Sequence, residues 1–242
     1  MKKNLLLLIC STLLALLTLS AQNKYTLGSV DSLPSAIIFL STPPQPGSID
    51  FARDSVHYVK NRSLKGAERW SQAYEDAAIL NDADNWVNLY EKEIGITISK
   101  EKTPALYSLL IQSEPYWKAA YNPAKKHFAR VRPFIYFNEP AGSTCDPADE
   151  PNLGNYLSYP SGHTAYGWSI ALILSEVFPE KQSELFKRAF DYGYSRVICG
   201  VHWLSDVEAG TTVATATIIY LNTRPAFVNL LNKARAEVKN LR

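Results

Sequence analysis

The sequence lacks any pattern that would form a β-sheet. No stretch alternates apolar and polar residues between hairpin turns, whereas almost every segment after residue 47 carries a helical spacing of apolar side chains. No internal repeat is visible in the 242 residues, which excludes a repeat architecture. The sequence therefore predicts an all-α protein with a single compact helical domain around a central buried apolar helix.

Long apolar runs are missing after the start of the chain. No later run reaches the ~18 uncharged residues of a membrane span. The one long run, Leu5 to Leu19, follows Met1-Lys2-Lys3 and predicts a secretory signal peptide over residues 1–21, followed by the mature domain over 22–242. An uncleaved N-terminal anchor is the alternative, although the run is shorter than the ~20 residues that a span needs.

The expected mature chain also lacks net charge. The sequence has 25 Lys and Arg against 23 Asp and Glu, and removal of Lys2 and Lys3 brings the basic residues to 23 as well. A neutral chain has no overall attraction for nucleic acid or anionic lipid. We therefore expect neither nucleic acid nor a membrane as a partner, and the cations described below form a local arrangement.

Cysteine is scarce, with three in the chain. Cys10 leaves with the signal peptide, so Cys145 and Cys199 remain. An even pair in an oxidising compartment favours a disulfide, which here would tie together two segments that flank the candidate site. The alternative is a buried free thiol at Cys199 and an exposed one at Cys145.

Apolar spacing and capping residues divide the mature chain into helices. Residues 22–47 are expected to be irregular and to end in the proline-rich segment Thr42 to Gly47. The expected helices begin or lie at these places: at Ser48, over 64–80 and 86–94, at Thr103-Pro104, at Pro123, over 163–178, 180–196 and 203–221, and from Phe227 onwards. The segment 203–221 is apolar enough to be the central buried helix, and 140–157 is expected to be a loop.

Three short blocks carry residues that suit phosphate binding, and the first holds Lys125 and Arg132-Pro133. A separation of seven residues is about two helical turns, so Lys125 and Arg132 are expected to project from one helix face toward a common anion. Pro133 is expected to end their helix. The planar guanidinium of arginine binds two phosphate oxygens at once. A solvated helix face is the alternative for this block taken alone.

The second block, Pro160-Ser161-Gly162-His163, precedes a long apolar helix. The backbone amides of Ser161 and Gly162 would then point out of a helix N-terminus and form an anion site. His163 would lie at the rim, where it can reach a leaving oxygen. Ser161 as a nucleophile is the alternative, but Tyr159 stands where a G-x-S-x-G turn has its first glycine.

The third block joins Ser195-Arg196 to His202 and Asp206. Because Asp206 follows His202 by four residues, its carboxylate can accept the imidazole Nδ1–H, and Nε2 stays free to attack. A hydrogen-bonded core histidine is the alternative for this helix alone. Metal ligation is another, but no cluster of His, Asp or Glu completes a coordination shell, and Arg196, Arg132 and Lys125 would repel a cation.

Other polar residues have no comparable setting in the sequence. We interpret His57 and His127 as structural or surface residues. The acidic residues Asp146, Asp149 and Glu150 are expected to lie in a solvated loop.

Together the blocks read Lys125-x6-Arg132-Pro133, Pro160-Ser161-Gly162-His163 and Ser195-Arg196-x5-His202-x3-Asp206. This pattern is similar to the signature shared by type 2 phosphatidic acid phosphatases, bacterial nonspecific acid phosphatases and vanadium haloperoxidases. Within that group the chain resembles the class A bacterial nonspecific acid phosphatases over nearly the whole mature chain, most clearly at Ser158–Thr164, Arg196–Trp203 and Pro43–Ser48. Leu157 departs from the class, which usually has glycine there, and this bears on loop detail and substrate preference.

The resemblance implies a periplasmic all-α enzyme, commonly a homo-oligomer, that hydrolyses many small phosphomonoesters without a metal or other cofactor. It also implies transfer to other alcohols and inhibition by phosphate or vanadate. By matching position, His202 would be the nucleophile that forms a phosphohistidine, Asp206 would orient it, and His163 would protonate the leaving alcohol and then activate water. The phosphate oxygens would be held by Lys125, Arg132, Arg196 and the amides of Ser161 and Gly162.

Three other functions compete with this interpretation. A vanadium haloperoxidase could use the same residues, but those chains are usually much longer. A membrane lipid phosphatase is disfavoured because the spans are missing. A non-enzymatic phosphate-binding protein would need neither His163 nor an oriented His202.

Overall fold

A computed structural model describes residues 27–81 and 86–241, and within them the chain is helical without a strand. The expected signal peptide lies outside the described residues. The α-helices are α2 (Ala36–Phe39), α3 (Ile49–Arg62), α4 (Glu68–Ala78), α5 (Glu91–Ile94), α6 (Pro104–Phe128), α7 (Pro133–Tyr136), α8 (Gly162–Val177), α9 (Gln182–Ile198), α10 (Leu204–Asn222) and α11 (Pro225–Leu241). Short 3₁₀ turns lie at Val30–Ser32, Ile79–Asn81, Trp86–Asn88, Glu150–Asn152 and Pro179–Lys181. The predicted all-α class is confirmed.

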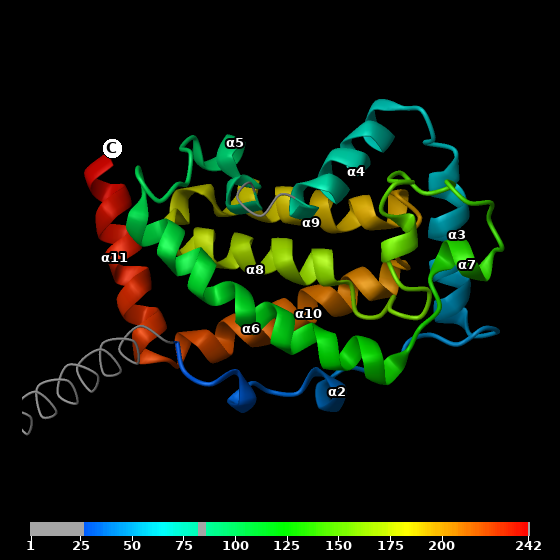
Figure 1. The fold of residues 1–242 in the computed structure, drawn as a ribbon, viewed down its shortest axis with the longest axis horizontal. Helices are drawn as coiled ribbons and strands as arrows, with labels where there is room; N and C mark the ends of the chain where they lie inside the picture. The colour runs from blue at the N-terminus through cyan, green and yellow to red at the C-terminus, as the bar shows by residue number, and fades with distance from the viewer. Residues whose placement is uncertain (1–26, 82–85, 242) are drawn as a thin grey trace, which may run out of the picture.

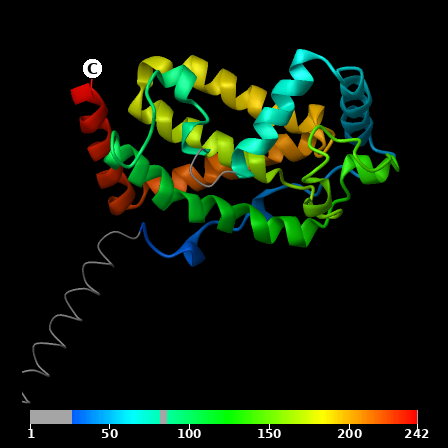
Figure 2. The same ribbon diagram turned by 45° about the horizontal axis from the view of Figure 1, so that its top comes forward.

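Helix α8 occupies the centre of the molecule. In Figures 1 and 2 it lies between α9 on one side and α6 and α10 on the other, with α11 across one end. The prediction that 203–221 forms the central helix is wrong, because α10 keeps a solvent face on which Ile219 is 63% exposed. Among the described residues, no helix combines the length and the apolar character that crossing a bilayer requires.

Small residues let the neighbouring helices approach α8 closely. A Cβ added at Gly167 of α8 would lie 2.4 Å from the Tyr192 ring of α9. A Cβ at Gly210 of α10 would lie 2.6 Å from the backbone oxygen of Ser161. These contacts fix where α9 and α10 meet the start of α8.

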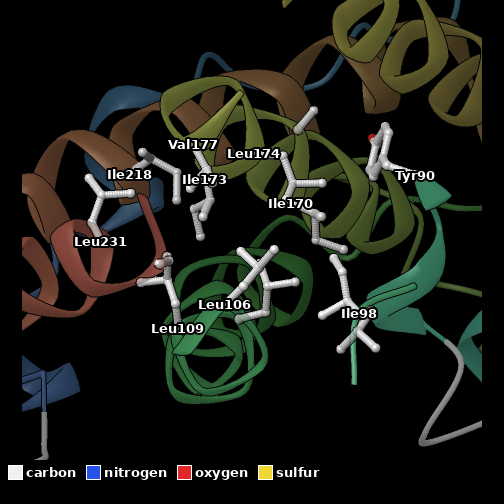
Figure 3. Close-up of a cluster of buried hydrophobic side chains, with 14 of the residues drawn as sticks. Tyr90, Ile98, Leu106, Leu109, Ile170, Ile173, Leu174, Val177, Ile218 and Leu231 are labelled. Carbon is white, nitrogen blue, oxygen red and sulfur yellow. The ribbon is translucent and has the colours of Figure 1, made fainter. Parts of the chain in front are cut away.

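The apolar core fills the space between α6, α8, α10 and α11 (Figure 3). Leu106 and Leu109 of α6 face Ile170 and Leu174 of α8, and all four are fully buried. Burial of one such side chain contributes roughly 1.5–3 kcal/mol relative to exposure. Ile218 and Leu231 extend the same cluster into α10 and α11.

One end of the helix bundle gathers four helix ends. The C-terminal ends of α6 and α9 and the N-terminal ends of α8 and α10 all lie there, at the right in Figure 1. The antiparallel course of these helices explains why three blocks that are distant in the sequence come together at this end.

The course of the chain near Pro123 differs from the prediction. Thr103 precedes α6 as expected, but α6 runs through both Pro115 and Pro123 to Phe128 instead of restarting. It ends at Ala129, which has a left-handed φ of 43°. Each proline removes one amide donor from the helix. The helix nevertheless continues through both prolines, because its side chains pack against neighbouring helices along its length.

Two other helices are shorter than the apolar spacing predicts. The segment 64–80 forms turns before α4 begins at Glu68. In the segment 86–94 a 3₁₀ turn precedes the four-residue helix α5.

The N-terminal segment 27–47 packs along α6 and α10 (Figure 1). It was expected to be irregular, yet it contains a 3₁₀ turn and the one-turn helix α2. The hydroxyls of Ser32 and Tyr220 lie 2.6 Å apart, and Tyr159 donates to the Ser41 carbonyl at 2.9 Å. The segment is therefore hydrogen-bonded to α10 and to the loop that precedes α8.

The N-terminus of α6 is capped by a residue from α11. The Glu237 carboxylate accepts from the amides of Ala105 and Leu106, both at 3.0 Å. We expect Glu237→Gln to lower the free energy of unfolding by about 1 kcal/mol, because one acceptor and the charge that favours a helix N-terminus are lost. Urea unfolding measures this. Lys233→Gln, on the exposed surface of α11, is the control and should unfold like the wild type; an equal loss in both variants would contradict the capping role.

Cys145 and Cys199 are joined by a disulfide, as the sequence predicts. Their Cα atoms are 4.5 Å apart, and the Cys145 amide donates to the Cys199 carbonyl at 3.2 Å. The bond spans a sequence separation of 54 and holds the 140–157 loop on the end of α9.

Loss of this disulfide should destabilise the protein by roughly 2–4 kcal/mol, because it closes a long loop in the unfolded chain. The measurement is urea unfolding of the Cys145→Ser, Cys199→Ser double variant against the wild type. Peptide mapping without reductant provides the companion check. Two thiols free to alkylate in unfolded, unreduced protein would contradict the pairing.

Candidate active site

The structure brings the three predicted blocks together at the end of the bundle described above. Lys125 is in the last turn of α6, and Arg196 is in the last turn of α9. The other residues lie at helix starts: Arg132 before α7, Ser161 before α8, His163 in α8, His202 before α10 and Asp206 in its first turn.

Arg132 reaches the site by a route that the sequence analysis did not predict. It is not on the helix of Lys125, because the backbone turns at Ala129 and becomes extended. Pro133 starts α7 instead of ending a helix, and Arg132 is the residue before that helix. Lys125 and Arg132 therefore come near one another through tertiary folding and not through a common helix face.

His202 and Asp206 are in contact, but not through adjacent turns of one helix. His202 precedes the helix, while Asp206 is in its first turn and accepts from the Trp203 amide at 2.9 Å. The same carboxylate oxygen, Oδ2, lies 3.2 Å from His202 Nδ1. This helix-capping contact places the carboxylate beside the imidazole.

The second nitrogen of His202 faces the cations. Arg132 Nη1 lies 3.3 Å from His202 Nε2. Because arginine can only donate, this contact requires a lone pair on Nε2, and the proton then sits on Nδ1 toward Asp206. Burial, followed by repulsion from Arg132, Lys125 and Arg196, lowers the pKa of His202 well below its usual value. The unprotonated Nε2 suits a nucleophile.

Lys125 and Arg132 are held by backbone carbonyls of the 153–158 loop. Lys125 Nζ donates to the Leu157 carbonyl at 2.7 Å. Arg132 donates to the carbonyls of Leu153 and Gly154 through Nε, and to that of Val201 through Nη1.

Burial and repulsion from neighbouring cations lower the pKa values of both side chains. Burial, with repulsion from Arg196, lowers the pKa of Arg132 to about 10. The pKa of Lys125 falls well below its usual value because of burial and then repulsion from Arg132. The carboxylate of Asp206 acts in the opposite direction on both side chains, but burial and the neighbouring cations have the larger effect.

Arg196 is a buried cation whose N–H groups are not all paired within the described part of the chain. Its side chain is 2% exposed, and its Nε and Nη1 atoms have no hydrogen-bond partner among the described residues. Burial lowers the pKa of Arg196, although Asp149 and Asp146 act in the opposite direction. A buried guanidinium with unpaired N–H groups is costly, so the position fits an anionic ligand.

The Ser161 amide does not serve the site as predicted. It donates to the Asp206 carbonyl at 2.8 Å and so fixes the start of α8 to α10. The Ser161 hydroxyl accepts from the Thr164 amide at 3.3 Å and from the Thr164 hydroxyl at 2.9 Å, which leaves its own proton to donate. Gly162 is the first residue of α8, so its amide has no acceptor within the helix.

Packing around residue 162 is tight. A Cβ there would lie 3.1 Å from the Tyr121 ring and 3.4 Å from Cε of Lys125. The missing side chain lets the start of α8 lie close to the end of α6.

His163 is only partly buried, and its Nε2 lies 3.3 Å from the Ala77 carbonyl of α4. This contact leaves Nδ1 for proton transfer. Burial, followed by electrostatic interactions with Arg196, His202 and Lys125, lowers the pKa of His163 well below its usual value. Negative charge bound among these cations would raise it again.

Two residues that hold the Asp206 carboxylate were missed by the sequence analysis. Arg130 Nη1 lies 2.6 Å from Asp206 Oδ1. The Ser158 hydroxyl donates to Asp206 Oδ2 at 2.5 Å. The segment Arg130-Val131-Arg132 carries a weak signal, since residues two apart in an extended segment point to the same side, which would place Arg130 near the site with Arg132.

The remaining predicted residues lie away from the histidine pair. His57 contacts the Tyr194 hydroxyl at 3.0 Å, and His127 is exposed beside Phe128. The prediction of a solvated acidic loop is wrong for Asp146, which is 8% exposed. Among the described residues, no group of three or more His, Cys, Asp or Glu side chains could hold a metal ion.

Comparison with known proteins gives consistent matches. Residues 105–229 match the PAP2 superfamily, and this range holds all three blocks. The chain is 42% identical to a non-specific acid phosphatase of Salmonella typhimurium over 203 residues, which are 82% of this chain and 78% of the relative. It is 39% identical to a non-specific acid phosphatase of Providencia stuartii over 215 residues, 88% of this chain and 83% of the relative. An acid phosphatase of Zymomonas mobilis is 34% identical over 211 residues, 85% of this chain and 76% of the relative.

Proposed function

The chain belongs to the PAP2 superfamily and is an acid phosphatase, and we propose that it hydrolyses a broad range of phosphate monoesters through a phosphohistidine at His202, without a metal ion. The observation that carries this proposal is the buried Arg196 guanidinium, whose Nε and Nη1 lack partners among the described residues. Beside Lys125 and Arg132 it forms a site with an excess of positive charge. A phosphate dianion supplies both the missing acceptors and the opposite charge.

In the first step, His202 Nε2 attacks phosphorus and the bond to the leaving oxygen breaks. Asp206 accepts the Nδ1 proton of His202 in a hydrogen bond and stabilises the positive charge that the ring gains. His163 donates a proton to the leaving oxygen, which departs as an alcohol. Lys125 and Arg196 neutralise the charge on the phosphoryl oxygens. Such electrostatic stabilisation is the protein's main contribution to the catalysis of phosphoryl transfer.

In the second step, a water molecule attacks the phosphohistidine. His163, now neutral, accepts the proton of that water, and the bond between phosphorus and His202 Nε2 breaks. Inorganic phosphate leaves and both histidines return to their starting states. An alcohol in the place of water would give phosphotransfer by the same sequence.

The proposal extends to the cellular setting. We expect export through residues 1–21 to the periplasm, a homo-oligomer, and inhibition by phosphate or vanadate at the same site. Vanadate adopts the five-coordinate geometry of the transition state, so it would bind among the same cations. Sedimentation of the mature protein measures the oligomeric state.

A substrate panel tests this function. Aryl phosphates, sugar phosphates, nucleotides and pyrophosphate are assayed with and without EDTA, and we expect several monoesters to turn over at rates that EDTA does not change. Loss of activity in EDTA would overturn the metal-free mechanism. Bromide oxidation by peroxide with added vanadate, without turnover of any phosphate ester, would favour a haloperoxidase instead.

A further inference from the structure

A chain of buried charges lies behind Asp206, on the side away from His202. Arg130 donates to Asp206 Oδ1 through Nη1 at 2.6 Å and to Asp54 Oδ2 through Nη2 at 2.7 Å. Asp54 belongs to α3, and it also accepts from the Ser205 amide at 2.8 Å and from the Ser205 hydroxyl at 2.5 Å. We call Asp54, Arg130 and Asp206 the buried charge chain.

All three members are withdrawn from water. Asp54 is 1% exposed, Arg130 7% and Asp206 0%. Arg130 also lies over the Trp203 ring, 5.2 Å from its centroid. Charges buried to this degree persist only when they are paired. Here the Arg130 guanidinium pairs with a carboxylate on each side, Asp54 of α3 and Asp206 of α10.

The hydrogen bonds of Asp206 show what the chain does. Oδ1 accepts from Arg130, while Oδ2 accepts from Ser158, from the Trp203 amide and from His202. With each oxygen assigned to its own donors, the carboxylate cannot rotate. Arg130 therefore keeps Oδ2 on the side of the imidazole, and Asp54 keeps Arg130 in place.

We propose that Asp54 and Arg130 are positioning residues that act on His202 through Asp206, and that they set both the orientation of Nε2 and the pH range in which it can attack. The proposal rests on the proposed function, in which His202 is the nucleophile. Neither residue belongs to the three blocks that bind phosphate. Their effect should therefore appear in kcat and in the pH profile more than in KM.

The charges around His202 predict opposite effects for the two residues. Other groups face the imidazole from every packed element: Lys125 on α6, Arg132 before α7, His163 on α8, Arg196 on α9 and Asp206 on α10. Removing the charge of Asp54 leaves Arg130 less neutralised and lowers the pKa of His202 further. Removing the charge of Arg130 strengthens the field of Asp206 and raises that pKa.

The test compares Asp54→Asn and Arg130→Gln with the wild type on p-nitrophenyl phosphate across pH. We expect kcat to fall about 10- to 100-fold in both, as for a misplaced reacting group, with KM changed less than about threefold because phosphate contacts remain. The acidic limb of kcat/KM should move to lower pH in Asp54→Asn and to higher pH in Arg130→Gln. Arg130→Lys keeps the charge, so its limb should stay near that of the wild type while kcat recovers in part.

Stability is measured in parallel, because either variant could fold less well. Glu237→Gln is the control. It weakens the N-terminal end of α6, far from the candidate site, and should change neither kcat nor the position of the acidic limb of kcat/KM. The proposal would be overturned if the acidic limb of kcat/KM stayed at the wild-type pH in Asp54→Asn and Arg130→Gln, or if it moved in the same direction in both variants. If Arg130→Gln does not fold, Asp54→Asn alone decides through the direction of its shift. Full activity of His202→Ala would instead overturn the proposed function itself.

Discussion

Replacing His202 with alanine should abolish turnover of every phosphate monoester, with kcat reduced about 10⁴- to 10⁶-fold as for other catalytic nucleophiles. The reason is geometric: Nε2 is the one ring nitrogen that faces the cations, while Nδ1 is held by Asp206 at 3.2 Å. Wild-type enzyme mixed with labelled substrate and denatured in alkali should carry a phosphoryl group that is stable to base and lost in acid. The His202→Ala enzyme should carry none.

His57→Ala is the matched control for this loss. His57 contacts Tyr194 and lies outside the three blocks, so its replacement should leave both turnover and labelling unchanged. Survival of wild-type activity in His202→Ala, or a label that maps to another residue, would exclude His202 as the nucleophile.

Replacing His163 with alanine should have an effect that depends on the leaving group. An alkyl alcohol must be protonated as it departs, so the loss on an alkyl phosphate should be about 10²- to 10⁴-fold. The phenolate of p-nitrophenyl phosphate departs unaided, and the loss there should be less than about tenfold. The measurement is kcat/KM on the two substrates with the same preparations. Equal losses would leave His163 with a phosphate-contacting role only.

The pH dependence follows from the directions of the two pKa shifts. Burial and the neighbouring cations hold the pKa of His202 well below 6.5, so Nε2 is unprotonated and kcat/KM is retained until pH falls through that lowered value. His163 must be protonated, and its pKa in the free enzyme is also lowered, chiefly by burial. Bound phosphate raises the pKa of His163, and kcat is lost as pH rises through the raised value. The rate plotted against pH should therefore be bell-shaped, with its maximum below neutral pH.

Local signals predicted most of the helices but not the path of the chain between them. Ser48 caps α3 through the Phe51 amide as its position suggests, because capping depends on neighbours three residues away. Pro123 was wrongly given the start of a helix, since a proline favours a first turn in sequence terms. Whether α6 continues through it depends on packing against α8 and α11, which no local spacing reports.

In the candidate site, too, local contacts were predictable from the sequence and long-range contacts were not. The contact between His202 and Asp206 was predicted, although helix capping and not adjacent turns produces it. Arg130 was missed because its partners Asp54 and Asp206 each lie 76 residues away in the sequence. A buried charge pair at that distance leaves no periodic trace in the sequence, so only the folded arrangement shows that Asp54 of α3 is linked to Asp206 through Arg130.

The clustered cations of the site link catalysis to folding. Arg196, Arg132 and Lys125 repel one another where little water reaches them, so their mutual repulsion destabilises the native state of the ligand-free protein. A ligand that binds the native state alone stabilises it by mass action, by about 2.7 kcal/mol at a concentration 100 times its dissociation constant. Inorganic phosphate, the product, would be such a ligand. The enzyme would therefore resist unfolding best where phosphate is already plentiful, and its lifetime would depend on the concentration of its own product.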